Sequence, residues 1–120
     1  MKKTILITII ALAGILISTT DSQAQKPPKK ATLEITVSGN CGMCERRINT
    51  ALDANGIMAS SWNRHTKKAE IVYNPRKISE DEIHELIAGV GHDTEKRKAK
   101  KEVYDKLPGC CQYRDNANTH

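Results

Sequence analysis

Four cysteines carry most of the chemistry that this sequence offers, and they come as two close pairs. Cys41 and Cys44 lie in the motif Gly-Asn-Cys-Gly-Met-Cys at 39–44, and Cys110 and Cys111 are adjacent near the end of the chain. Two thiolates spaced like the first pair reach a single ion, at about 2.3 Å from each sulfur, when the backbone turns between them. Soft sulfur ligands select Cu(I), Zn(II) and heavier thiol-seeking ions over Mg(II) or Ca(II). The first pair therefore predicts a soft-metal site.

The first pair also admits two other interpretations. A plain disulfide is the ordinary fate of cysteines in an oxidising compartment, but a bridge closing so short a loop removes little unfolded-state entropy. A thiol-disulfide oxidoreductase that uses Cys41 and Cys44 is the alternative from another class. Thioredoxin-like enzymes carry an aromatic residue before the first Cys and a cis-Pro facing the pair, whereas here Asn40 and a distant Pro75 stand in those roles. We favour metal capture, and no residue set supports hydrolysis or group transfer, so we predict that the protein is not an enzyme.

The second pair needs its own explanation. A disulfide between neighbouring cysteines is strained, so Cys110 and Cys111 are better explained as free thiols, as bridges to a partner or as metal ligands. We treat both as candidate accessory ligands. Their presence also leaves open a dimer bridged by the metal.

The N-terminus has the pattern of a secretory signal peptide. Residues 1–3 are Met-Lys-Lys, residues 4–18 are an uncharged apolar run, and Ser-Gln-Ala at 22–24 is a small-x-small cleavage site. The apolar run is shorter than the roughly 20 residues that a spanning helix needs. We therefore predict cleavage after Ala24, a periplasmic or secreted mature chain, and no stable membrane insertion after cleavage.

The charge of the mature chain argues against nucleic acid as a partner. It keeps 17 basic and 13 acidic residues, a net charge of +4, with the basic residues concentrated at 26–30 and 96–101. Readers of single-stranded nucleic acid combine such charge with aromatic stacking platforms. This chain has no Phe, one Trp and three Tyr, so the basic clusters are better explained as solvated charge.

The pattern from Thr32 to Arg97 predicts six elements, in the order strand, helix, strand, strand, helix, strand. Apolar residues alternate at 33, 35 and 37, and helical spacing follows from Met43 until Asn-Gly at 55–56. Ser79 and Glu82 form a capping box before the second helix. The predicted strands cover 32–37, 57–63, 68–73 and 92–97. This is the split βαβ, ferredoxin-like α+β arrangement, with one four-stranded antiparallel sheet and both helices on one face.

That topology brings His92 towards the first cysteine pair. The fourth strand would run antiparallel to the first and beside it, so the start of the fourth faces the end of the first. Cys41 follows the first strand and His92 opens the fourth. We therefore expect His92 to act as a third ligand or as a residue that tunes the site.

These motifs together resemble the heavy-metal-associated domain family, which includes copper chaperones and periplasmic mercury-binding proteins. The resemblance rests on Gly-x-Cys-x-x-Cys after the first strand, Asn-Gly-Ile at 55–57, Val-Tyr-Asn-Pro at 72–75 and Ile-Ala-Gly-Val-Gly-His at 87–92. It implies that Cys41 and Cys44 bind the metal. The family usually has Met-Thr or Met-His before the first Cys, whereas Gly39 and Asn40 stand there in this chain.

The resemblance also implies cargo and partners. We expect Cu(I) as the metal, with Hg(II), Zn(II) or Cd(II) as alternatives, and a metal-transporting ATPase or cation efflux system as the partner. The chain then divides into a signal peptide (1–24), a flexible Pro- and Lys-rich linker (25–31), a heavy-metal-associated domain (32–98) and a tail with the second cysteine pair (99–120).

Overall fold

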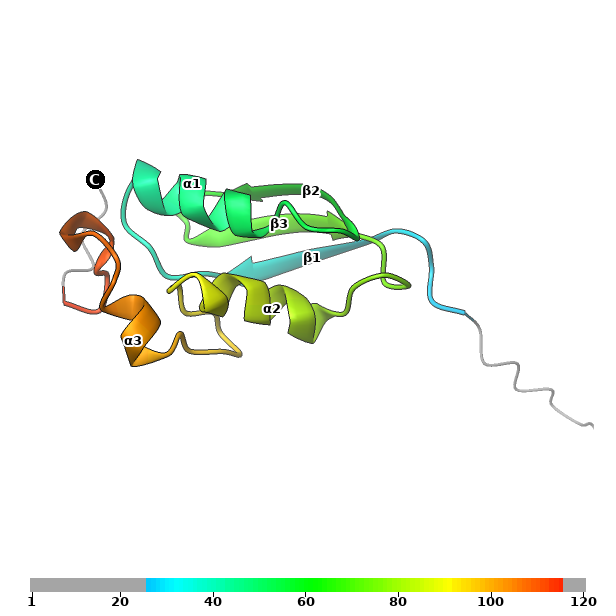
Figure 1. Cartoon of the computed structure of the whole chain (residues 1–120). Coiled ribbons are helices and arrows are strands. Elements are labelled where there is room, and N and C mark those ends of the chain that lie inside the picture. Colours follow the sequence, from blue (N-terminus) through cyan, green and yellow to red (C-terminus); the bar gives the residue numbers. More distant parts are fainter. Residues whose placement is uncertain (1–25, 116–120) are drawn as a thin grey trace, which may run out of the picture.

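The computed structural model describes residues 26–115, so the predicted signal peptide and residues 116–120 lie outside the described residues. Three strands form one antiparallel sheet in the order β1-β3-β2: β1 (Ala31–Thr36), β2 (Ile57–Trp62) and β3 (Lys68–Tyr73). Two ten-residue helices, α1 (Gly42–Ala51) and α2 (Glu80–Gly89), pack beside each other against this sheet (Figure 1). The predicted ferredoxin-like α+β character is confirmed.

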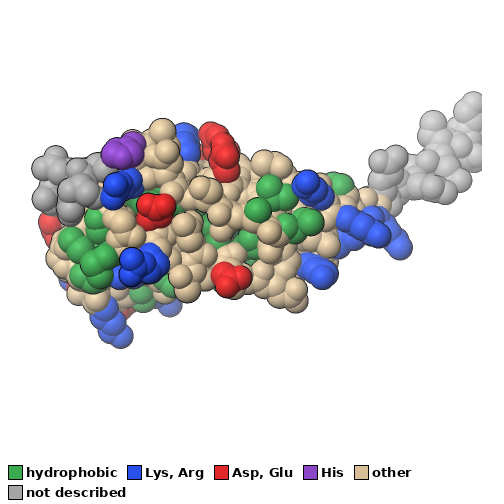
Figure 2. All heavy atoms as spheres, turned by 90° about the horizontal axis from the view of Figure 1, so that it is seen from above, with side chains coloured by type: hydrophobic (Ala, Val, Ile, Leu, Met, Phe, Trp, Pro, Cys, Tyr) green, Lys and Arg blue, Asp and Glu red, His purple; other side chains and the backbone are tan. Residues whose placement is uncertain are grey.

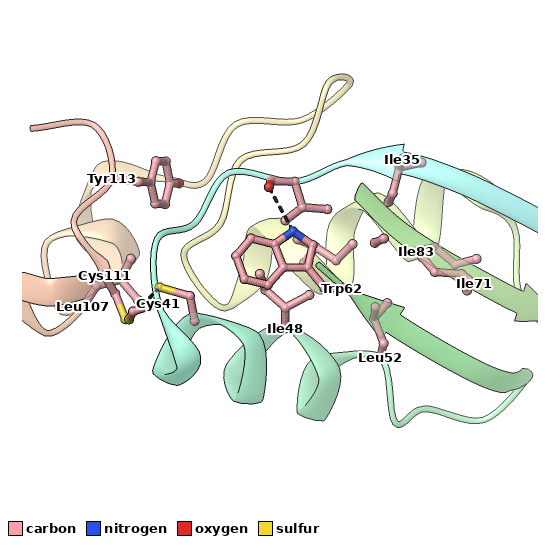
Figure 3. Close-up of a cluster of buried hydrophobic side chains, with 14 of the residues drawn as sticks. Ile35, Cys41, Ile48, Leu52, Trp62, Ile71, Ile83, Leu107, Cys111 and Tyr113 are labelled. Atoms are coloured by element: carbon pink, nitrogen blue, oxygen red, sulfur yellow. Dashed lines mark hydrogen bonds between the residues drawn. The ribbon is translucent and has the colours of Figure 1, made fainter. Parts of the chain in front are cut away.

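Alternating side chains of the strands and one stripe of each helix form the core. The register of β1 on β3 places Ile35 opposite Ala69, and both are buried. The predicted capping box of α2 is present: the Ser79 backbone N–H donates to Glu82 Oε2 at 2.7 Å, and the Glu82 N–H donates to Ser79 Oγ at 3.2 Å. Figure 3 shows the apolar side chains that meet between sheet and helices, among them Ile35, Ile48, Leu52, Trp62, Ile71 and Ile83.

The prediction of a fourth strand at 92–97 is wrong for the described chain. Only one isolated antiparallel bridge, between Val37 and Thr94, continues the sheet beyond β1. The Thr94 hydroxyl accepts from the backbone N–H groups of Lys96 and Arg97 at 3.2 and 3.0 Å, and so turns the chain away from the sheet. Because a side chain of this polar segment already accepts hydrogen bonds from the backbone N–H groups of the segment, these groups are not available for a strand ladder.

Thr94 also explains a buried histidine. His84 of α2 is fully buried, and its Nδ1 lies 2.6 Å from Thr94 Oγ1. This contact fixes the turn at 94–97 against α2.

The prediction of two helices is corrected by two further short elements after residue 98. These are α3 (Lys101–Tyr104) and the 3₁₀ turn η1 (Gly109–Cys111). We call residues 99–115 the C-terminal strap. This segment folds back over the end of the sheet where α1 begins (Figure 1).

Apolar and charged contacts hold the strap in place. Leu107, Cys111 and Tyr113 are buried and belong to the core cluster. The Tyr113 hydroxyl donates to the carbonyl of Gly91 at 2.8 Å and accepts from the Asp93 N–H at 2.8 Å. Such aromatic anchors are not visible in a polar tail sequence, because their partners lie far away along the chain.

The surface of the described residues mixes charges of both signs. Figure 2 shows acidic and basic side chains interspersed on one face, with several Lys and Arg gathered towards the N-terminal end. No helix among residues 26–115 has the length and apolarity needed to cross a bilayer.

The loop before α1 rests on Trp62. The indole Nε1–H donates to the carbonyl of Val37 at 3.1 Å, and the ring lies directly beneath Gly39. A Cβ at Gly39 would stand 2.9 Å from Trp62 Cη2 and 3.2 Å from the Cβ of Cys44. Trp62 therefore fills the space under the cysteine loop, and only glycine fits above it.

This packing predicts that Gly39→Ala destabilises the fold by about 1–3 kcal/mol, because an extra methyl in a filled core displaces its neighbours. Urea unfolding followed by the emission of the single tryptophan measures the effect. Gly89→Ala is the matched control, since nothing lies within 4 Å of a Cβ there and Ala in a helix is favoured by up to about 1 kcal/mol. Equal stability of the Gly39 variant and the parent would contradict the packing argument.

Candidate metal centre

The first cysteine pair sits where the chain passes from β1 to α1. Cys41 is the N-cap residue, with an extended backbone at φ −138° and ψ 176°, and its carbonyl accepts the first helical bond from Glu45 at 3.0 Å. Cys44 lies in the first turn of α1. The turn brings the two Sγ atoms to 3.4 Å from each other, and both residues are buried.

A third thiol completes the cluster. The Sγ of Cys111, on η1 and 70 positions away, lies 3.5 Å from the Sγ of Cys41. Figure 3 shows these two side chains facing each other between the strap and α1. The three sulfur atoms lie within 4.8 Å of one another, and no other His, Cys, Asp or Glu among residues 26–115 belongs to the cluster.

The two residues of the second pair occupy different positions. Cys111 is buried within the cluster, whereas Cys110 is only half-buried. The Sγ of Cys110 lies 3.9 Å from Cys111 Sγ and 3.6 Å from the Sδ of Met43, whose side chain is exposed. Of the two candidate accessory ligands, the fold thus brings Cys111 into the buried cluster and leaves Cys110 at its outer side.

The surroundings shift the acidity of the thiols in opposite directions. Burial raises the pKa of Cys41, but hydrogen bonds from the Cys44 backbone and from the thiols of Cys44, Cys111 and Cys110 outweigh it and lower the pKa from 9.0 to about 7. Burial raises the pKa of Cys111, and its hydrogen bonds with Cys44 and Cys41 act in the same direction. The cluster thus combines a thiol with a lowered pKa, Cys41, and a thiol with a raised pKa, Cys111.

Two cations that the sequence analysis did not single out stand beside the sulfurs. Arg47 Nη1 donates to Cys111 Sγ at 3.2 Å. Lys67 Nζ donates to the carbonyl of Gly39 at 2.5 Å; burial lowers its pKa, and the charges of Cys44 and Cys41 act in the opposite direction. The position of Arg47, three residues after Cys44 on a helix, is a sequence signal that places the two on one face. Lys67 carries no such signal.

His92 lies next to the loop but not in the sulfur cluster. It is fully buried, its Nδ1–H donates to the carbonyl of Ser38 at 2.8 Å, and its ring stacks on Tyr113 at 5.6 Å between centroids. Burial lowers the pKa of His92 to about 4, so the imidazole is neutral at physiological pH. The Nε2 is buried without a hydrogen-bond partner among the described residues. Its role as a third ligand or tuning residue stays a prediction.

Comparison with known proteins finds a likeness in structure. No protein-family profile and no curated protein matches the sequence. Among solved structures, the CopZ metallochaperone matches with a TM-score of 0.52 and 21% identity, over 53% of this chain and 98% of its own. A putative copper-ion-binding protein from Bacillus anthracis matches with a TM-score of 0.53 and 20% identity, over 55% of this chain and 96% of its own. A copper-binding domain from HMA7, a P-type ATPase, matches with a TM-score of 0.52 and 27% identity, over 53% and 89%.

The resemblance to heavy-metal-associated domains is confirmed. The chain has their fold and carries the Cys-x-x-Cys motif at its strand-to-helix turn. The match spans nearly all of CopZ but little more than half of this chain. The residues outside the match, the C-terminal strap among them, are additions to the part that resembles CopZ.

The lowered pKa of Cys41 predicts a pH-dependent stability in the reduced, metal-free protein. A thiol whose folded pKa is depressed contributes stability above its unfolded pKa, and this is lost as pH falls through the folded pKa. The free energy of unfolding should therefore decrease as the pH is lowered from about 9.0 to about 7. Urea midpoints across this range, with thiolate ultraviolet absorbance recorded alongside, measure it. Cys41→Ser should abolish the ionisation near pH 7, and its persistence in that variant would assign it to another group.

Proposed function

We propose that this protein captures a soft, thiol-seeking metal ion, Cu(I) first, between Cys41 and Cys44 and delivers it to a metal transporter. The observation that carries the proposal is the pair of buried sulfur atoms 3.4 Å apart at the strand-to-helix turn of a heavy-metal-associated fold. Thiolates are the ligands that soft ions prefer, and hydrogen bonds from the neighbouring cysteines lower the pKa of the Cys41 thiol to about 7.

The ligand set favours Cu(I) among the ions considered. Structural zinc sites are almost always tetrahedral with four ligands. The described residues gather three sulfur atoms, and among residues 26–115 no further His, Cys, Asp or Glu supplies a fourth ligand to the cluster. A low-coordinate ion such as Cu(I) is satisfied by this set, and Hg(II) and Cd(II) share its preference for sulfur.

The proposed partner is a metal-transporting ATPase or a related cation efflux system. Support comes from the copper-binding domain of HMA7, which belongs to a P-type ATPase and shares this fold at 27% identity. An acceptor with a matching thiol pair receives the ion by ligand exchange, one sulfur replacing another, so the ion is never released to water. In this proposal the chain binds the ion and transfers it to the acceptor.

A titration of Cu(I) tests capture. The reduced chain 25–120 should bind one Cu(I) per chain in competition with the chelator bathocuproine disulfonate, and affinity should weaken as pH falls because ligand thiols must lose protons. The Cys41→Ser, Cys44→Ser double variant should lose high-affinity binding, while circular dichroism reports that it is folded. Full affinity in the double variant would overturn the proposal.

Export forms the second part of the proposed function. Expression of the full-length chain in a Gram-negative host should yield a periplasmic protein whose N-terminus, determined by mass spectrometry, is Gln25. The reason is the charged start, apolar run and Ser-Gln-Ala site at 1–24. Replacing Lys2 and Lys3 with Glu should slow export. Recovery of an uncleaved chain from the cytoplasm would contradict it.

A further inference from the structure

We infer that the C-terminal strap supplies Cys111 as a third ligand, so that the protein holds its ion in a three-sulfur site and releases it only when the strap's thiol is displaced. The inference rests on the proposed function, since it concerns the same ion, and it changes what the site does. A two-sulfur loop alone is open to an acceptor, whereas a strapped site retains its cargo.

The geometry of the three sulfurs fits one ion. Sulfurs bound at about 2.3 Å in a trigonal plane stand about 4.0 Å from one another. In the structure Cys41 Sγ lies 3.4 Å from Cys44 and 3.5 Å from Cys111, and all three sulfurs fall within 4.8 Å. Small side-chain rotations, which move each sulfur atom by a fraction of an ångström, therefore suffice to place the three sulfurs around one ion.

The strap reaches this position through contacts that do not involve sulfur. Arg114 donates to both carboxylate oxygens of Asp93, at 2.7 and 3.2 Å, and its Nη2 also donates to the carbonyl of Ala99 at 2.8 Å. Its guanidinium lies 4.2 Å from the centre of the Tyr104 ring. Leu107 packs on Gly91, which adopts φ +102° and would meet Leu107 at 3.0 Å if it carried a Cβ. The fold thus holds Cys111 against Cys41 before any ion arrives.

Positive side chains near the cluster can compensate the net negative charge of three thiolates around one ion. Three thiolates around one Cu(I) carry a net charge of −2, which is costly to bury without compensation. Arg47 donates directly to Cys111 Sγ at 3.2 Å, and Lys67 is held beside the loop through Gly39. In a site made only of Cys41 and Cys44, the hydrogen bond from Arg47 to Cys111 would not stabilise a ligand of the ion.

The binding step balances as a ligand exchange. Cu(I) leaves the ligands of the donor that carried it, which depart with their electron pairs, and forms three Cu–S bonds, to Cys41, Cys44 and Cys111; each thiol that is still protonated passes its proton to the buffer, and no electron is transferred. On delivery, an acceptor thiolate replaces Cys111 first, because that ligand lies on a separate short segment while the other two are fixed by α1. The strap thereby sets the rate of release.

X-ray absorption of the Cu(I)-loaded full mature chain tests the coordination directly. The parent should show three sulfur neighbours, and Cys111→Ser should show two with shorter Cu–S distances. Competition with bathocuproine disulfonate should give Cys111→Ser an affinity at least about tenfold lower, since even loss of an outer-shell partner costs 10- to 100-fold. Release of Cu(I) to the chelator should be faster by a similar factor.

Cys110→Ser is the matched control, because it removes the neighbouring thiol that lies outside the cluster; it should keep three sulfurs and lose less affinity than Cys111→Ser. Cys111→Ala provides a second variant that preserves the apolar packing, and tryptophan emission reports whether each variant is folded. Two sulfurs in the parent, or equal affinity for the Cys110 and Cys111 variants, would overturn the inference while leaving capture by Cys41 and Cys44 intact. A parent that binds no Cu(I) would instead defeat the proposed function.

Discussion

The contact on which the site depends is that of Cys41 Sγ with two other sulfurs, one three residues away and one 70 residues away. The near contact is local, because the turn into α1 makes it. The far contact requires the strap to cross the end of the sheet and return to the loop. Closing this long loop costs chain entropy, and the apolar packing of Leu107 and Tyr113 offsets that cost. The neutral thiols themselves are easily buried, because a free Cys behaves as a small hydrophobe with a weak S–H donor.

Rigidity beneath the loop is the second constraint. Trp62 fills the space under the metal loop from β2, and Gly39 leaves room for it. From the other side, His92 donates to Ser38 and stacks on Tyr113. The loop that carries Cys41 is therefore fixed below by the sheet and behind by a histidine that also contacts the strap. The same histidine links the strap's position to the loop's.

The sequence was sufficient for the local features of this fold and insufficient for the distant ones. Alternation at 33, 35 and 37, the capping box at Ser79 and the Cys-x-x-Cys turn are written within a few residues, and the structure has all three. The fourth strand failed because Thr94 satisfies nearby backbone groups with its own hydroxyl. The strap resembled a polar tail, since its anchors find their partners far away along the chain, as Tyr113 does on Gly91, 22 residues away. Arg47 could have been identified from the sequence, because it follows Cys44 by three residues on a predicted helix and so lies on the same face.

A strap that both packs on the domain and supplies a ligand couples its docking to metal binding. By linkage, if docking raises the affinity for the ion by some factor, the ion strengthens docking by the same factor. The contacts of Arg114 with Asp93 and of Tyr113 with Gly91 lie away from the sulfurs, yet they reduce the entropy that Cys111 loses on ligation. A weakly docked strap would deliver its ion readily, and a tightly docked one would hold it. If the proposed function holds, the balance between capture and release depends on Tyr113 and on the ion pair of Arg114 with Asp93 as well as on the cysteines.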